Sequence, residues 1–149
     1  DRRGDYIADV CRHYGYRALR VPDATEGGNH LFQIRKAITA DAPANIAIWG
    51  FRAERRHCNP FGIVHGGMLT TFADTMMGSL VFHAIAGAPC ATITLTMDFV
   101  GAGREGDWIE GRAELLRQGR SICFLRSELR SNDKIILNAS GVWAIIGSC

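Results

Sequence analysis

The most informative stretch of the chain joins a polar loop to a helix that carries one charged side chain. The loop contains Asn59 and ends in His65-Gly66-Gly67, and Asp74 follows nine residues after His65. The start of a helix presents N–H groups without intrahelical partners and a partial positive charge. Two glycines there let a carbonyl oxygen approach because no Cβ stands in the way. Gly66 and Gly67 therefore suit an oxyanion hole, in which N–H groups stabilise negative charge on a carbonyl oxygen, and they also fit a plain glycine-rich turn before a helix.

Asp74 is the only charged side chain between Gly66 and Ile85. Burying an unpaired carboxylate costs on the order of several kcal/mol, so such a group is usually paired, protonated or functional. The neighbouring threonines can hydrogen-bond to Asp74, but none of them carries an opposite charge. The position fits a general base, and it also fits a carboxylate that faces a small polar pocket or an arginine from elsewhere.

Several other chemistries are excluded by motifs that the sequence lacks. Serine esterases that use His-Gly-Gly also need Gly-x-Ser-x-Gly, and a phosphate-binding P-loop needs Gly-Lys-Ser/Thr. Neither motif occurs. The cysteines are Cys11, Cys58, Cys90, Cys123 and Cys149. An odd, scattered set without C-x-x-C spacing argues against a disulfide framework and against a zinc site, and it indicates a reduced, cytoplasmic setting.

The composition is that of one globular domain. Of 149 residues, 47% are hydrophobic and 21% are charged, which excludes a disordered chain. The net charge of +2 is too small to indicate a nucleic-acid partner. No apolar run approaches the roughly 18 residues of a membrane helix, and no signal peptide is visible. We therefore expect neither nucleic acid nor membrane as a partner.

The hydrophobic pattern divides the chain into an N-terminal segment, residues 1–45, and a single domain, residues 46–149. The first segment is expected to be irregular, with a short helix over 5–14 and a first strand over 31–38. Apolar residues at helical spacing predict one helix over 66–85, about 30 Å long, that is buried nearly all round. Alternation of apolar and polar residues predicts further strands over 46–53, 92–99, 108–117, 122–130 and 135–146.

The turns between the last strands are short, which favours antiparallel pairing. The expected architecture is therefore α+β, with one long central helix enclosed by an antiparallel sheet of about five strands.

The combination of Asn59, His65-Gly66-Gly67 and Asp74 resembles the hotdog-fold acyl-CoA thioesterases of the phenylacetate-degradation type. The flanking runs Arg56-His57-Cys58-Asn59-Pro60 and Thr71-Phe72-Ala73-Asp74 fit the same family. The resemblance covers roughly Trp49 to Ile146, and it is specific for the family but not for the substrate.

The resemblance implies a role for each motif residue. Asp74 would be the base that activates water, or the nucleophile itself, and the Gly66 N–H would polarise the thioester carbonyl. Asn59 would assist that polarisation or hold the water, and His65 would orient the loop or contact the carbonyl. Gly67 and Thr92 are expected to bind substrate, Thr92 because related enzymes often have a hydroxyl there that positions the water. No metal or redox cofactor is implied, and coenzyme A enters as part of the substrate.

Geometry adds an inference about assembly. Gly66 and Asp74 lie eight residues apart on one helix, which is about 12 Å along its axis. Both cannot lie within about 3 Å of one carbonyl, so a shared site needs two chains. A two-fold dimer with antiparallel central helices would bring Gly66 of one protomer to Asp74 of the other. The family resemblance implies the same homodimer, often paired again into a homotetramer.

Two alternatives stay open beside a thioesterase. One is a sensor that binds acyl-CoA without catalysis, although such a protein would need no base. The other is a hotdog-fold dehydratase, although the expected His/Asp or His/Glu arrangement is not visible. The acyl donor could also be acyl carrier protein. Arginines that could meet coenzyme A phosphates are Arg104, Arg117, Arg120 and Arg126.

Overall fold

A computed structural model describes residues 18–20, 35–36, 38–39 and 43–147. The predicted helix over 5–14 lies outside these ranges, and so does part of the strand predicted over 31–38. The described elements are β1 (Ala18–Arg20), β2 (Arg35–Lys36), β3 (Ile38–Thr39), β4 (Ile46–Arg52), the 3-10 turn η1 (Arg55–His57), α2 (Gly66–Ala84), β5 (Cys90–Phe99), β6 (Trp108–Gln118), β7 (Ile122–Ser131) and β8 (Lys134–Ile145). The domain boundary between residues 45 and 46 stays a prediction.

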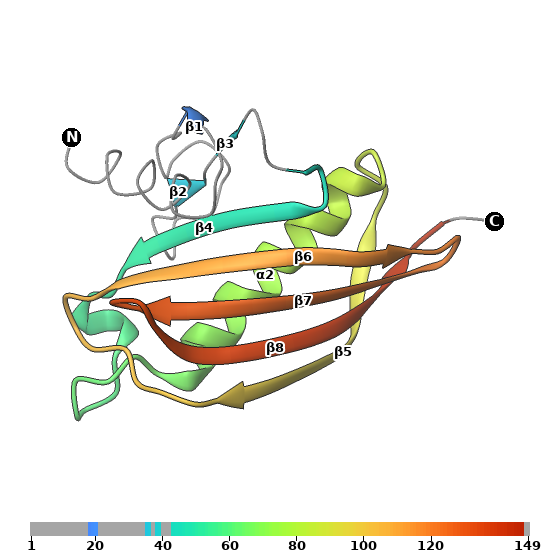
Figure 1. The fold of residues 1–149 in the computed structure, drawn as a ribbon. Helices are drawn as coiled ribbons and strands as arrows, with labels where there is room; N and C mark the ends of the chain where they lie inside the picture. The colour runs from blue at the N-terminus through green and yellow to red at the C-terminus, as the bar shows by residue number, and fades with distance from the viewer. Residues whose placement is uncertain (1–17, 21–34, 37, 40–42, 148–149) are drawn as a thin grey trace.

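The long strands form one antiparallel sheet in the order β2-β4-β6-β7-β8-β5, with β4 at the top and β5 at the bottom of Figure 1. Five of these strands are long, as the sequence predicts, and β2 adds a two-residue pairing with β4. The short strands β1 and β3 pair separately. Since β5 pairs only with β8, it forms a free edge of the sheet within the described residues.

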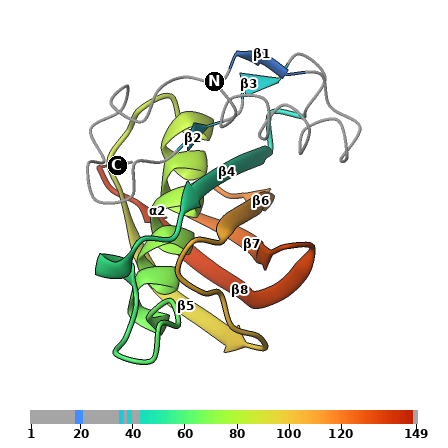
Figure 2. The same ribbon diagram turned by 90° about the vertical axis from the view of Figure 1, so that its left-hand side faces the viewer.

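The core lies between α2 and one face of the sheet (Figure 2). Phe72, Met76 and Met77 of the helix are fully buried. The ring of Phe72 packs edge-on against Phe51 of β4, with centroids 4.8 Å apart. Burying a side chain of this size contributes about 1.5–3 kcal/mol to folding, so this contact fixes how the helix lies across the strands.

The expectation of a helix buried nearly all round is wrong for the single chain. Apart from Gly66 and Met68 at its start and Ala84 at its end, the exposed or half-buried positions of α2 are Gly67, Thr70, Thr71, Asp74, Thr75, Gly78, Ser79, Phe82 and His83, and we refer to this set as the helix stripe. The reason is geometric, because the sheet covers only one side of α2 and a helix surrounded by apolar residues needs a second cover. His83, near the end of the helix, is exposed.

A bulge in β5 changes which side chains face the helix. Thr92 pairs with Trp143 and Thr94 with Val142, so Ile93 is inserted between two ladder positions. Strict alternation would put Thr92 and Leu95 on opposite faces of the strand. The inserted residue lets Thr92 reach the helix, while Leu95 packs against the core on the same side.

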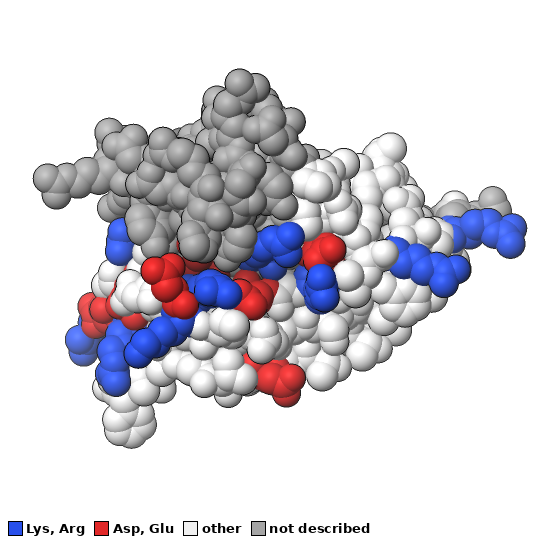
Figure 3. Space-filling view, viewed as in Figure 1, with Lys and Arg blue, Asp and Glu red and all other residues white. Residues whose placement is uncertain are grey.

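The face of the sheet away from α2 is charged (Figure 3). Opposite charges face each other across β6 and β7 in three pairs, Glu110 with Arg130, Arg112 with Glu128 and Glu114 with Arg126. A hydrogen bond from Arg126 lowers the pKa of the Glu114 carboxyl. Such a face stays hydrated, so a helix can bury apolar surface only on the opposite side.

The described cysteines are free thiols. Cys123 is fully buried in β7, where it packs as a small core residue. Among the helices of the described ranges, none has the length and apolar character needed to span a membrane.

Candidate active site

Asn59 is held by its carbonyl oxygen, which leaves its amide nitrogen available. The Oδ1 atom accepts hydrogen bonds from the N–H groups of Phe61, at 3.0 Å, and Ile63, at 3.2 Å. The backbone N–H of Asn59 also donates to the Ile63 carbonyl oxygen at 2.8 Å. The Nδ2 group has no acceptor among the described residues. The side chain therefore folds its own loop and at the same time presents an oriented donor.

His65 caps the helix and is itself fixed by a buried histidine. Its Nδ1 accepts the Gly67 N–H at 2.9 Å, and its carbonyl oxygen accepts the N–H groups of Met68 and Leu69. Its own N–H donates to the His57 carbonyl oxygen at 2.9 Å. His57 is 1% exposed, and its Nδ1 accepts the Glu54 N–H. This network orients the loop, which is one of the two roles expected for His65.

The network leaves one donor at the start of α2. The N–H groups of Gly67, Met68 and Leu69 are all accepted by His65. The Gly66 N–H has no acceptor in the described part of the chain. A single N–H at a helix start, where the dipole adds positive potential, is a suitable donor to an oxyanion. The Gly67 N–H donates to this cap, and the expectation that Gly67 binds substrate stays a prediction.

Phe99, at the end of β5, lies against Gly66. A Cβ on Gly66 would meet the Phe99 ring at 3.3 Å, which is closer than almost all such contacts. The end of β5 can therefore approach the start of α2 this closely only because Gly66 has no side chain. Phe99 itself is 53% exposed, so its ring forms part of the surface beside the free donor.

Asp74 lies in the middle of the helix stripe and is half-buried. Its Oδ1 accepts a hydrogen bond from the Thr92 hydroxyl at 2.8 Å. The structure therefore brings together two of the expected site residues within one chain. No described basic side chain forms an ion pair with Asp74, so the carboxylate keeps acceptor capacity for a water molecule.

Cys90 lies close to Asp74 but is poorly suited to act as a nucleophile. Its Sγ points to the Gly78 carbonyl oxygen at 3.9 Å. Burial, followed by the negative charge of Asp74, raises the pKa of the Cys90 thiol. The thiolate is the reactive form of cysteine, and this thiol stays protonated at neutral pH.

Three threonine hydroxyls of the helix stripe bond to the helix backbone. Thr70 donates to the Gly66 carbonyl oxygen at 2.9 Å, and Thr71 donates to that of Gly67 at 2.8 Å. Thr75 donates to the Thr71 carbonyl oxygen at 2.7 Å. None of these hydroxyls serves Asp74, so Thr92 is its described hydroxyl partner.

Within one chain the expected site residues form two groups that do not meet. Asn59 and His65 belong to the loop that leads to Gly66, which lies beside Phe99 at one end of β5. Asp74 lies beside Thr92, near the other end of that strand. The separation is about 12 Å along the helix and roughly 20 Å along the strand. We call the first group the donor half, because it offers the free N–H groups, and the second, Asp74 with Thr92, the acceptor half.

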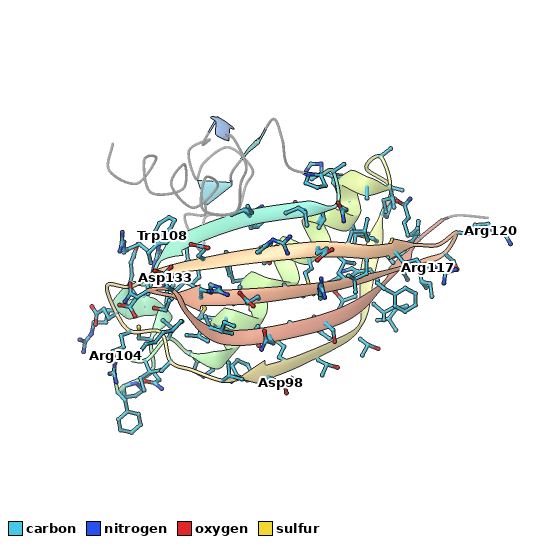
Figure 4. All side chains as sticks on the ribbon, in the orientation of Figure 1. Asp98, Arg104, Trp108, Arg117, Arg120 and Asp133 are labelled. Carbon is cyan, nitrogen blue, oxygen red and sulfur yellow. The ribbon has the colours of Figure 1, made fainter. Side chains whose placement is uncertain are left out.

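The arginines expected near phosphate groups do not converge. Arg117 and Arg120 lie at the turn between β6 and β7, and Arg104 lies at the opposite end of the sheet (Figure 4). Arg126 is on the charged face, where it pairs with Glu114 at 2.8 Å. One phosphate of one ligand cannot contact all of them in a single chain. In the described residues, no group of three His, Cys, Asp or Glu side chains could hold a metal ion.

Some residues of the site were not anticipated from the sequence. His57 was noticed only as part of a flanking run, and its buried contact with the His65 N–H requires the fold. Phe99 appeared as one member of an alternating strand. A signal was present in Gly66, since a glycine at a helix start often marks a close approach by another group.

Comparison with known proteins identifies the family. The family model for the thioesterase superfamily matches residues 61–136. A Pseudomonas aeruginosa protein provisionally named as an esterase is 34% identical over 104 residues, which are 69% of this chain and 77% of that protein. Acyl-coenzyme A thioesterase 13 of Mus musculus is 24% identical over 108 residues, covering 72% of this chain and 77% of the mouse protein.

A solved structure matches nearly the whole chain. It is a Ralstonia eutropha protein provisionally named a thioesterase and described as related to phenylacetic acid degradation. The two structures superpose with a TM-score of 0.65 at 26% identity, over 92% of this chain and 89% of that one. The resemblance predicted from the motif and the hotdog architecture of one helix against an antiparallel sheet are both confirmed.

Proposed function

Because the chain belongs to the thioesterase superfamily, and is thus a thioester hydrolase, we propose that it hydrolyses acyl-coenzyme A to a free acid and coenzyme A. The observation that carries this proposal is the pair of donors without acceptors among the described residues, Gly66 N–H and Asn59 Nδ2. Two such donors on one rigid loop suit an oxyanion. The name of the mouse relative supports coenzyme A as the thiol part of the substrate.

The proposed mechanism begins with water held by Asp74. The carboxylate takes a proton as the water oxygen forms a bond to the thioester carbon, and the carbonyl electron pair moves to the oxygen. Gly66 N–H and Asn59 Nδ2 stabilise the resulting oxyanion. When the carbonyl re-forms, the C–S bond breaks, and the leaving thiolate takes the proton from Asp74. Direct attack by Asp74 would form an anhydride that water then hydrolyses, and a transfer of oxygen-18 from the carboxylate would reveal that route.

The other residues position these groups. Thr92 donates to one oxygen of Asp74 and so directs the other oxygen to the water. His65 fixes the first turn of α2 through its cap on Gly67. Gly67 contributes by lacking a side chain, because a Cβ there would lie 3.0 Å from the His65 ring.

We propose that the donor half and the acceptor half of one site come from two chains. The helix stripe is incompletely covered, and β5 offers an unpaired edge within the described residues. Next to them lie apolar side chains that a second copy would bury, namely Phe82, Ile93, Phe99 and Val100. A two-fold dimer with antiparallel α2 helices would form two equal sites, and a dimer of dimers stays a prediction.

The proposal includes no metal and no redox cofactor, since water activation by a carboxylate needs neither. Coenzyme A takes part only as a portion of the substrate. We also propose a cytoplasmic setting, which the free thiols of Cys58 and Cys90 support because such compartments keep thiols reduced.

Release of free thiol from acyl-coenzyme A, followed with a thiol-reactive dye, tests the proposed reaction. A thioesterase releases one thiol per acid formed, whereas a sensor binds the ligand and releases none. A dehydratase would remove water from a hydroxyacyl-coenzyme A and leave the thioester intact. An acyl carrier protein thioester, tested beside acyl-coenzyme A, separates the two acyl donors.

A further inference from the structure

Trp143 of β8 lies under the helix stripe with its indole nitrogen turned toward α2. Its side chain is 2% exposed, and it pairs across the sheet with Thr92 on one side and Cys123 on the other. Gly141 makes room for the ring, because a Cβ there would lie 2.5 Å from Cζ3. At the other end of the ring, Nε1 lies 3.4 Å from the position that a Cβ on Gly78 would occupy.

The N–H of this indole has no acceptor in the part of the chain that the structure describes. Nε1 faces the space that the missing side chain of Gly78 leaves, and Gly78 itself is half-buried, not buried. The donor therefore reaches the surface at Gly78, through the space that the missing side chain leaves.

This donor belongs to the neighbourhood of the acceptor half. Gly78 follows Asp74 by four residues and thus lies on the same face of α2, about 6 Å further along the axis. Thr92, which binds Asp74, is the cross-strand partner of Trp143, and such partners have Cβ atoms about 5 Å apart. A ligand whose carbonyl carbon lies at Asp74 can therefore reach Nε1 with an atom a few bonds away.

We infer that Trp143 selects the acyl group by donating a hydrogen bond from Nε1 to an oxygen atom about one helical turn from the thioester carbonyl. This inference rests on the proposed function. Water satisfies the donor in the free protein, and an apolar acyl group would cover the donor without replacing that bond. Leaving a buried donor unpaired is costly, and sites built around such a donor discriminate against ligands that lack the acceptor. The favoured substrates are thus acyl-coenzyme A esters with a keto or hydroxyl oxygen at that distance.

Two variants remove the donor in opposite ways. Trp143→Phe deletes the N–H and keeps an aromatic ring, although the smaller ring should lower the melting temperature. Gly78→Ala keeps the indole and covers Nε1 with a methyl group at an ordinary contact distance. Since alanine has a higher helix propensity than glycine, this variant should not lower the melting temperature. Ser79→Ala, a neighbouring substitution on the same stripe, is the control.

The test compares acyl-coenzyme A pairs that differ by one oxygen. The pairs are hexanoyl-CoA with its keto derivative at the penultimate carbon, and phenylacetyl-CoA with para-hydroxyphenylacetyl-CoA. For the wild type, kcat/KM should be roughly fivefold to a hundredfold higher for the oxygenated member of at least one pair. Trp143→Phe and Gly78→Ala should each bring that ratio close to one, while Ser79→Ala keeps it.

The outcomes separate the two ideas. Equal use of both members by the wild type, or a preference that survives Gly78→Ala, overturns the role of Trp143 and leaves the proposed function standing. A purely structural Trp143 would lower both rates together in Trp143→Phe and leave Gly78→Ala unchanged. Absence of thiol release from every thioester would reject the proposed function and this inference with it. The ratios of kcat/KM are compared only between proteins that have the same oligomeric state by light scattering. A change in assembly then cannot account for a change in the ratio.

Discussion

The donor half and the acceptor half of the site differ in how many of their own polar groups they satisfy. In the loop from Glu54 to Gly67, side chains and backbone bind one another, and Gly66 N–H and Asn59 Nδ2 are two donors without an acceptor among the described residues. Asp74, in contrast, has one described hydrogen bond, from a strand that lies at the edge of the sheet. The first half is built before any ligand arrives, whereas the second depends on what covers it.

This difference teaches which property each half supplies. A donor that must stabilise a developing charge works best when it is already fixed, because no reorganisation is then needed. A base must give and take a proton, so it needs an acceptor position left open to water. Changes in the donor half should therefore affect the rate through geometry, and changes in the acceptor half should affect it through proton transfer.

The largest effect is expected from Asp74→Asn. The amide keeps an oxygen that can accept the Thr92 hydroxyl, so the fold and the melting temperature should be retained. Loss of the base should lower turnover about 10²–10⁴-fold, measured as thiol release at saturating substrate. A variant that keeps more than a tenth of wild-type turnover would show that the acceptor half does not supply the base.

A second, smaller loss is expected from removing the Asn59 donor. Asn59→Asp keeps both acceptor interactions with the loop but lacks the Nδ2 donor, so turnover should fall about 10²-fold. Asn59→Ala removes the donor and both loop hydrogen bonds, so the melting temperature should fall as well. Comparing the two variants separates catalysis from loop stability. An active Asn59→Asp variant would mean that Asn59 serves the loop alone.

The separation of the two halves can be tested by mixing inactive proteins. Asp74→Asn and Asn59→Ala are refolded together in equal amounts, which gives hybrids in about half of the dimers. In each hybrid one site collects both defects and the other collects neither, so about a quarter of wild-type activity should return. If both halves of a site came from one chain, a mixture shown by mass spectrometry to contain hybrids would be no more active than its parents.

A more modest effect is expected at Thr92. Thr92→Val removes the hydroxyl that orients Asp74, and a hydrogen bond of this kind is worth about 1 kcal/mol. Turnover should fall roughly fivefold to tenfold, and Thr92→Ser should restore most of it. Equal rates for the wild type and Thr92→Val would leave Asp74 without a positioning partner in its own chain.

The smallest effect concerns acid stability near the donor half. Burial acts to raise the pKa of Asp107, but hydrogen bonds from Arg104, Ser131 and Asn132 outweigh it, so the pKa is lowered overall. A folded-state pKa below the unfolded one contributes stability at neutral pH, and this contribution is lost as the pH falls through the folded value. The melting temperature should drop less between neutral and strongly acidic pH in Asp107→Asn than in the wild type. Equal drops would contradict the assignment.

The sequence was sufficient for those parts of the site that depend on local order. Asp74 stood out as a lone charge on an apolar helix, and Gly66 stood out as a glycine at a helix start, so both halves of the proposed site were predicted from one segment. The five long strands followed from alternation alone. The position of Thr92 could not be derived in this way, because strict alternation turns it away from Leu95 and only the bulge at Ile93 brings it to the helix.

Other features depended on contacts between distant segments. Nothing near Trp143 in the sequence indicates that its nitrogen reaches the surface beside Gly78, 65 residues earlier in the chain. The incomplete burial of α2 was missed because a period of 3.6 residues shows which positions are apolar but not which molecule covers them. A second chain is the simplest cover that an apolar helix can have.

The threonines of the helix stripe bear on how easily that surface loses its hydration layer. The hydroxyl groups of Thr70, Thr71 and Thr75 each donate a hydrogen bond to a backbone carbonyl oxygen one turn earlier in the helix. When another surface displaces water from these side chains, no hydroxyl donor is left without a partner, and the usual cost of drying a polar group is reduced. These three threonines therefore lose water at a lower cost than threonines whose hydroxyl groups depend on water for a partner.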